Sequence, residues 1–141
     1  TLVQQLQLVG IVGIECFLTQ DDRVFINEIA PRTHNSGHYT LDACLTSQFE
    51  QQLRAISNQP LGATDLNCPQ ALMVNLLGLE TSPEEHQIRL QRLKDLPHAQ
   101  VYWYEKAPRP GRKLGHITLR LGGEDDPAKM AAEVEHLWYD G

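Results

Sequence analysis

Residues 11–30, IVGIECFLTQDDRVFINEIA, contain two β-rich runs on either side of an acidic turn. The runs at 11–18 and 24–30 are rich in β-branched and aromatic residues, which favour strands, and the segment QDDR between them is typical of a turn. We therefore predict an antiparallel hairpin at residues 11–30.

The length of the turn decides which residues face each other across this hairpin. A two-residue loop at Asp21 and Asp22 places Glu15 directly opposite Glu28, and a four-residue loop at 20–23 preserves that pairing. An odd-length loop without a bulge would put the two glutamates on opposite faces. Like charges facing each other across a ladder are unfavourable unless a cation lies between them. Because oxygen ligands favour hard ions, we predict that the pair binds Mg²⁺, with Mn²⁺ as the alternative.

The neighbourhood of Glu28 favours this metal site over a simpler interpretation. In the simpler one, both glutamates point into water from the polar face of a two-sided hairpin. Solvated hairpins rarely concentrate polar and titratable groups, yet several lie within a dozen residues of Glu28: Asn27, Arg32, His34, Asn35 and His38.

The remaining sequence predicts a mixed α/β (α+β) fold in two parts. Ser47 and Glu50 have the spacing of a helix capping box, and Phe49, Leu53 and Ile56 form an apolar stripe behind it. Residues 59–69 carry two prolines and a glycine without periodicity, so we place a domain boundary there, giving domains 1–66 and 67–141. Further helices are predicted at 2–10, 82–94 and 128–138, and further strands at 71–78, 100–106 and 115–122.

Composition excludes some classes of function. The formal net charge of −6 argues against general nucleic-acid binding, and no apolar run approaches the ~20 residues needed to cross a bilayer. The three cysteines, Cys16, Cys44 and Cys68, lack paired metal-ligand spacing, which indicates buried, reduced thiols and a cytoplasmic protein. Residues 102–120 nevertheless carry a local net charge of +4.

The motifs GIECF and INEIAPRTHNSGHYT resemble the carboxy-terminal half of ATP-grasp ligases, in particular the 5-(carboxyamino)imidazole ribonucleotide synthetases. The similarity continues through SQFEQQLRAI and resumes at YEKAPRPGRKLGHITL, so it covers most of the chain. It implies the end of an ATP-grasp domain followed by a small β-rich closing domain with helices. It also implies an ATP- and Mg²⁺-dependent enzyme that carboxylates 5-aminoimidazole ribonucleotide with bicarbonate, and a homodimeric parent protein.

The resemblance assigns roles to residues in both parts of the chain. In this family two acidic residues on neighbouring strands hold Mg²⁺ at the nucleotide phosphates, and by motif these are Glu15 and Glu28. Arg32 is expected to bind phosphate or bicarbonate as a planar fork, and His34 to orient the substrate or relay a proton. The expected catalytic residues are Arg32, His34 and Asn35, and the expected substrate-binding residues are Ser36, Gly37, His38, Lys106, Arg112 and Lys113.

The basic segment acquires a function through the same resemblance. The ribonucleotide carries a 5′-phosphate, and Lys106, Arg112 and Lys113 resemble the family's contacts to that group. Pro108 and Pro110 stiffen the segment, so its charges are presented with little ordering entropy to overcome. A solvated cationic loop is the competing interpretation. Tyr102, Trp103 and Tyr104 are expected to be structural.

Two alternatives to this function remain open. One is another ATP-grasp carboxylase or ligase with a different acceptor, and the other is a non-catalytic binding module derived from such an enzyme. In the family, the lysines that clamp ATP, the adenine pocket and the glycine-rich loop lie upstream of the segment matched here. We therefore expect this chain not to turn over ATP unaided.

Overall fold

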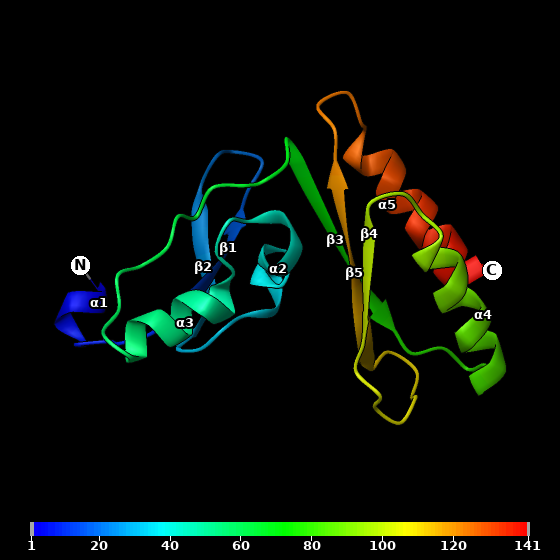
Figure 1. Ribbon diagram of the computed structural model, residues 1–141, viewed down its shortest axis with the longest axis horizontal. Coiled ribbons are helices and arrows are strands. Elements are labelled where there is room, and N and C mark those ends of the chain that lie inside the picture. Colours follow the sequence, from blue (N-terminus) through cyan, green and yellow to red (C-terminus); the bar gives the residue numbers. More distant parts are fainter. Residues whose placement is uncertain (1, 141) are drawn as a thin grey trace. The chain divides into compact units, whose positions relative to one another are not determined.

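The computed structural model describes residues 2–140 and separates into two compact units, Thr1–Asp65 (unit 1) and Leu66–Gly141 (unit 2). Each unit has its own antiparallel sheet (Figure 1). The elements of unit 1 are α1 (Leu2–Gln5), β1 (Gly13–Leu18), β2 (Val24–Ala30), the 3-10 helix η1 (Asn35–Gly37), α2 (Thr40–Ala43) and α3 (Gln48–Ile56). Those of unit 2 are β3 (Gln70–Leu77), α4 (Pro83–Lys94), β4 (Ala99–Trp103), β5 (Lys113–Leu121), α5 (Pro127–Glu135) and the π-helix η2 (His136–Asp140).

Unit 1 is built on the predicted hairpin, in which β1 pairs with β2. The helix predicted at 2–10 is shorter than expected, because α1 ends at Gln5 and Gln7 adopts a left-handed φ of 50°. The helices η1 and α2 follow the hairpin and were not predicted. Their polar residues carry no hydrophobic periodicity, which is the signal that indicates a helix.

Helix α3 begins where the capping-box spacing predicted. The Ser47 hydroxyl accepts the backbone N–H of Glu50 at 3.1 Å, and after the helix Asn58 has a left-handed φ of 54°. The apolar stripe of α3 is largely on the surface, with Leu53 63% and Ile56 56% exposed. The buried residues of this helix are Gln48 and Gln51.

Unit 2 is a three-stranded sheet in the order β3-β5-β4, with α4 and α5 packed on one face (Figure 1). Helix α4 is capped by Ser82, whose hydroxyl accepts the N–H of Glu85 at 3.1 Å, with Pro83 in its first turn as predicted. Between the helices and the sheet lies an apolar core of Leu76, Leu90, Leu93, Ile117, Leu119, Leu121, Val134 and Trp138.

Two predicted elements of unit 2 have different ends. The strand expected to reach residue 106 ends at Trp103, and Glu105 has a left-handed φ of 53°, which an extended strand cannot contain. The final helix passes into η2, which places Trp138 fully in the core with its indole N–H donating to the Leu77 carbonyl at 2.9 Å. A buried Trp needs such an acceptor.

The cysteines differ in part from expectation. All three are free thiols, as predicted, but Cys16 is exposed and Cys44 and Cys68 are only partly buried. Cys16 lies on β1, a strand whose two faces both reach the surface. Among residues 2–140, no helix has the length and apolar character needed to cross a membrane.

Candidate functional site: a carboxylate–histidine cluster

The hairpin places Glu15 opposite Glu28, as predicted, but by a different route. The connection is odd in length: Asp22 N–H donates to the Thr19 carbonyl at 3.1 Å, and Asp22 has a left-handed φ of 58°. The strands therefore leave the turn in a register that would bring Glu15 opposite Asn27. A β-bulge lies opposite the step from Glu15 to Cys16. Asn27 is the extra residue on β2, so Glu15 pairs with Glu28.

The bulge also gives Asn27 a direct role at the site. In such a bulge two consecutive residues oppose one residue of the partner strand, so Asn27 and Glu28 both face Glu15. The side-chain amide of Asn27 donates a hydrogen bond to a carboxylate oxygen of Glu15. The prediction of a two- or four-residue loop was wrong, because the sequence pattern does not reveal the extra residue on β2.

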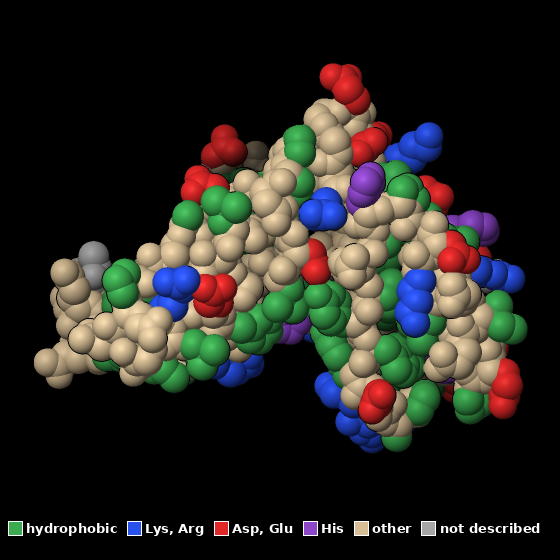
Figure 2. Space-filling view, viewed as in Figure 1, with side chains coloured by type: hydrophobic (Ala, Val, Ile, Leu, Met, Phe, Trp, Pro, Cys, Tyr) green, Lys and Arg blue, Asp and Glu red, His purple; other side chains and the backbone are tan. Residues whose placement is uncertain are grey.

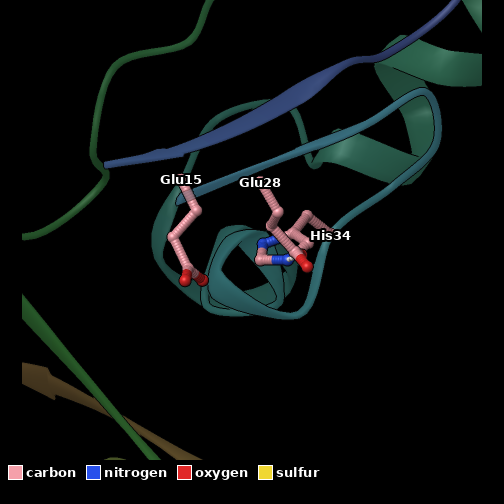
Figure 3. Close-up of side chains that lie close together, drawn as sticks. All are labelled: Glu15, Glu28 and His34. Carbon is pink, nitrogen blue, oxygen red and sulfur yellow. Dashed lines mark hydrogen bonds and ion pairs between the residues drawn. The ribbon is translucent and has the colours of Figure 1, made fainter. Parts of the chain in front are cut away.

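The two carboxylates and His34 form one cluster. Each of Glu15, Glu28 and His34 offers a ligand atom, and these three atoms lie within 4.8 Å of one another. Figure 3 shows the two glutamates descending from adjacent strands to the same side, with the His34 ring beside Glu28. Two carboxylates and one imidazole are groups that bind divalent cations, and the opposed carboxylates leave negative charge for a cation to neutralise.

Hydrogen bonds define the state of His34 in this arrangement. The Ser36 N–H donates to Nδ1 of His34 at 3.3 Å, so Nδ1 accepts and the proton resides on Nε2. Nε2 then donates to a Glu28 carboxylate oxygen at 2.7 Å. A ring nitrogen that donates a proton cannot coordinate a metal at the same time. His34 can therefore either hold Glu28 or, in the other neutral tautomer, carry its proton on Nδ1 toward the Ser36 hydroxyl at 2.8 Å and offer Nε2 as a third ligand.

Close packing sets the position of His34 against the hairpin. A Cβ atom built on Gly13 would lie 2.8 Å from the His34 Cβ, closer than real side chains approach. Glycine at the start of β1 therefore lets the loop after β2 cross directly over the strand. The His34 side chain is only 14% exposed, whereas that of Glu28 is 52% exposed.

The other predicted residues of unit 1 occupy the same loop but make different contacts. Arg32 is exposed, and its Nη1 donates to the Thr33 carbonyl at 2.9 Å. Asn35, Ser36 and Gly37 form η1, and the Ser36 hydroxyl lies 2.8 Å from Nδ1 of His34. The His38 ring stacks on Phe49, with ring centroids 5.4 Å apart.

Sequence reasoning missed Gln48, the first residue of α3. Its side-chain amide contacts the backbone of His34 and the ring of His38, and the residue is only 9% exposed. The capping box located the start of the helix correctly. It could not indicate that the following glutamine turns inward, because a polar residue in the first turn normally faces water.

The predicted phosphate-binding residues belong to unit 2. Lys106 lies on the β4–β5 connection, with Nζ 5.0 Å from the centre of the Tyr104 ring, and Arg112 Nη1 donates to the Ala107 carbonyl at 3.2 Å. Figure 2 shows Lys and Arg side chains gathered over this connection. Partial burial, and then repulsion from Lys106, lowers the pKa of Lys113. Two cations that disturb each other in this way favour an anion beside them.

A cavity of about 380 Å³ adjoins this basic segment within unit 2. Its lining includes Lys106, the ring of Trp103 and the buried His86 of α4. Directly after β4, the Tyr104 hydroxyl forms a hydrogen bond of 2.6 Å with Nδ1 of His116 on β5. Burial raises the pKa of the Tyr104 hydroxyl. Trp103 packs edge-on against Trp138, which agrees with the structural role predicted for it.

Comparison with known protein families matches both units. The ATP-grasp domain matches residues 1–49, and the phosphoribosylaminoimidazole carboxylase C-terminal domain matches residues 71–133. The chain thus belongs to the ATP-grasp proteins that carry this C-terminal domain, which confirms the resemblance and the predicted fold class.

The individual relatives are more specific. The chain is 56% identical to N5-carboxyaminoimidazole ribonucleotide synthase from Synechococcus elongatus, over 98% of this chain and 36% of that protein. The phosphoribosylaminoimidazole carboxylase ATPase subunit from Aquifex aeolicus superposes with a TM-score of 0.86 at 42% identity, over 97% of this chain and 41% of that one.

A third relative was crystallised with ligands. N5-carboxyaminoimidazole synthase from Aspergillus clavatus, in complex with ADP and 5-aminoimidazole ribonucleotide, superposes with a TM-score of 0.74 at 36% identity. The match covers 93% of this chain and 33% of that structure. The chain therefore spans between about a third and two fifths of the length of these relatives.

Proposed function

We propose that this chain is the carboxy-terminal part of an ATP-dependent ligase of purine biosynthesis. The full-length enzyme would join bicarbonate to the amine of 5-aminoimidazole ribonucleotide, giving N5-carboxyaminoimidazole ribonucleotide, ADP and phosphate. The observation that carries this proposal is the cluster of Glu15, Glu28 and His34, whose ligand atoms lie within 4.8 Å on the segment that matches the ATP-grasp domain. The names of the relatives supply the reaction.

The cluster suits the electrostatic demands of phosphoryl transfer. Glu15 and Glu28 would hold Mg²⁺, or Mn²⁺ in its place, and the bound ion supplies charge neutralisation for the phosphates of ATP. Arg32 is exposed and lies between Glu28 and His34 in the sequence. Its guanidinium can turn from the Thr33 carbonyl toward phosphate or bicarbonate.

The loop after the hairpin would handle the activated carboxyl group. A carboxyphosphate is a labile mixed anhydride, so it needs hydrogen-bonding groups around it and protection from water. His34 would orient the reacting groups together with Asn35, and the remaining loop residues would bind substrate. These are Ser36, Gly37 and His38.

The basic segment of unit 2 would bind the 5′-phosphate of the ribonucleotide. Lys106 and Lys113 are close enough for their charges to interact, and a phosphate between them would relieve that repulsion. Arg112 adds a bidentate donor on the same segment. The family resemblance further implies a homodimeric enzyme, and the free cysteines favour a cytoplasmic one.

The test is turnover by the full-length ligase that carries this segment. ADP release would be followed with 5-aminoimidazole ribonucleotide, bicarbonate and Mg²⁺, for the unsubstituted enzyme and for Glu28→Gln. The substitution keeps the size of the side chain and removes its charge, so we expect turnover to be abolished with the thermal midpoint unchanged. Glu124→Gln, on an exposed turn of unit 2, is the matched control. Normal turnover in Glu28→Gln would refute the proposal.

The phosphate role has a separate test in the same assay. We expect Arg112→Ala to raise the apparent KM for the ribonucleotide and to leave the KM for ATP unchanged, because only one substrate loses its contact. Arg92→Ala, an exposed change on α4, controls for loss of positive charge. An unaltered KM for the ribonucleotide in Arg112→Ala would contradict this role.

A further inference from the structure

Gln48 occupies an unusual position for a polar residue at the start of a helix. Its backbone N–H donates to the Thr40 hydroxyl at 2.9 Å, and that hydroxyl in turn donates to the Gly37 carbonyl at 2.6 Å. The side chain is directed inward and the residue is 9% exposed. Buried amides of this kind need partners for all their polar atoms, and Gln48 finds them in the loop that follows the hairpin.

The amide of Gln48 binds both backbone groups of His34. The Oε1 atom accepts the His34 N–H at 2.9 Å, and Nε2 donates to the His34 carbonyl at 2.7 Å. These two bonds fix which end of the amide is oxygen and which is nitrogen. They also hold the residue whose ring reaches Glu28, so the position of the His34 ring depends on Gln48.

The second N–H of the same amide defines the tautomer of His38. Nε2 of Gln48 lies 2.9 Å from Nδ1 of His38. An amide NH₂ group can only donate, so Nδ1 must accept and the proton of the neutral ring must be on Nε2. The stacking of the ring on Phe49 holds it in this orientation.

Gly37 provides the space that the amide requires. A Cβ atom at this position would lie 2.6 Å from Oε1 and 2.8 Å from the amide carbon of Gln48. The amide is held by three hydrogen bonds and has little freedom to move aside. The loop therefore closes around Gln48 only with glycine at position 37.

We propose that Gln48 is a positioning residue in the active site. Its importance for catalysis rests on the function proposed above. Its amide fixes the backbone of His34 beside Glu28 and holds His38 as the tautomer protonated on Nε2. The His38 ring then carries its proton on the nitrogen that Gln48 does not contact.

The chain provides a matched control at Gln51, one turn further along α3. Its amide also clamps a backbone, donating to the Gly62 carbonyl at 2.6 Å and accepting the Gly62 N–H at 3.0 Å. The residue is similarly buried, at 6% exposure. Gln51 holds a different segment, so replacing it tests the loss of a buried amide without disturbing the two histidine contacts.

The first experiment is ¹⁵N NMR of the histidine rings in the unsubstituted protein and its variants. We expect Nδ1 of His38 to give the shift of an unprotonated nitrogen at a pH where the ring is neutral. In Gln48→Glu a carboxylate that only accepts replaces the donor, so the proton should move to Nδ1. Gln51→Glu should leave the His38 signals unchanged. A protonated Nδ1 in the unsubstituted protein overturns the inference, and this result does not depend on any variant folding.

The second experiment measures turnover in the full-length ligase. Loss of a supporting hydrogen-bond partner typically reduces activity by about 10–100-fold, and we expect this fall in kcat for Gln48→Glu. Gln51→Glu should lower the thermal midpoint by about as much as Gln48→Glu does, but its kcat should equal that of the unsubstituted enzyme. Equal kcat in both variants would overturn the positioning role. Absence of turnover in the unsubstituted enzyme would refute the proposed function. It would not refute the tautomer assigned to His38, because NMR measures that tautomer without substrate.

Discussion

The two units of the molecule are stabilised in opposite ways. Unit 2 has a conventional interior, in which leucine, isoleucine and tryptophan side chains fill the space between a sheet and two helices. In unit 1 the only buried apolar residues within the described chain are Ala30 and Ala43, and the buried residues of α3 are glutamines. Both faces of its hairpin are lined by exposed apolar residues, among them Phe17, Phe25 and Ile29.

This difference shows that the site in unit 1 is organised by hydrogen bonds rather than by apolar packing. Glutamine amides clamp the backbone at His34 and Gly62, and each bond fixes a direction as well as a distance. Such a network specifies the orientation of polar groups better than packing does, at some cost in stability. Exposed apolar faces on a two-stranded sheet are also typical of a surface that contacts further protein.

The largest effect is expected from Trp138→Ala in unit 2. This change removes the largest fully buried side chain together with its hydrogen bond to Leu77, so unfolding of unit 2 should become easier by about 3–5 kcal/mol. Hydrogen exchange resolved along the chain would measure it. Protection in β3 and β5 should fall while protection around Gln48 is retained. An equal loss of protection in both units would show that the stability of one interior depends on the other.

A smaller effect is expected from Gly37→Ala in unit 1. The new methyl group would press on the Gln48 amide, and overpacking of this kind typically costs about 1–3 kcal/mol. Gly123→Ala, which meets no atom within 4 Å, should leave stability almost unchanged. Denaturant titration of both variants would give the difference. If Gly37→Ala is as stable as its control, the Gln48 amide has more freedom to move than its three hydrogen bonds indicate.

The helix caps allow a direct comparison of the two units. Ser47 and Ser82 make the same hydrogen bond, each accepting the N–H three residues later at 3.1 Å. We expect replacement of either serine by alanine to cost about 1 kcal/mol. Ser47→Ala should in addition shift the NMR signals of His34 and His38, because α3 carries Gln48. Unchanged histidine signals would indicate that the loop does not depend on the start of α3.

The smallest effect concerns Lys113, whose pKa is lowered by burial and by Lys106. A lowered pKa means that the folded state binds the proton less tightly than the unfolded state. This group therefore opposes folding below its folded pKa, and stability rises as pH increases from that value to the ordinary 10.5.

The same reasoning predicts the response of Lys113 to substitution and to an anion. Lys106→Ala should raise the pKa of Lys113, as should added phosphate, and ¹³C NMR of the lysine side chains would follow both. Lys129→Ala, on α5, serves as the control. A Lys113 pKa that does not respond to phosphate would argue for a solvated cationic loop.

Much of this architecture could be predicted from sequence because local chemistry determines it. The hairpin follows from β-branched runs, and the starts of α3 and α4 follow from serine caps. The pairing of Glu15 with Glu28 was predicted correctly, although the loop that produces it was not. The predicted loop had the wrong parity and the bulge at Asn27 was not predicted, and these two errors cancelled.

The parts that could not be predicted depend on contacts between segments far apart in the sequence. Gln48 lies fourteen residues from His34, and its inward orientation follows from the space left by Gly37 and the hydroxyl of Thr40. The left-handed conformation of Glu105, which ends β4 early, likewise has no signal in the residue type. Hydrophobic periodicity does not carry such information.

The proposed function requires Glu15 and Glu28 to act together on one divalent ion. The most direct test is a double-mutant cycle in the full-length ligase with Glu15→Asp and Glu28→Asp, measuring the Mg²⁺ concentration that gives half-maximal ADP release. If both carboxylates share one site, the two changes should be coupled by about 0.5–3 kcal/mol. Effects that simply add would contradict a shared ion and, with it, the function proposed for the hairpin.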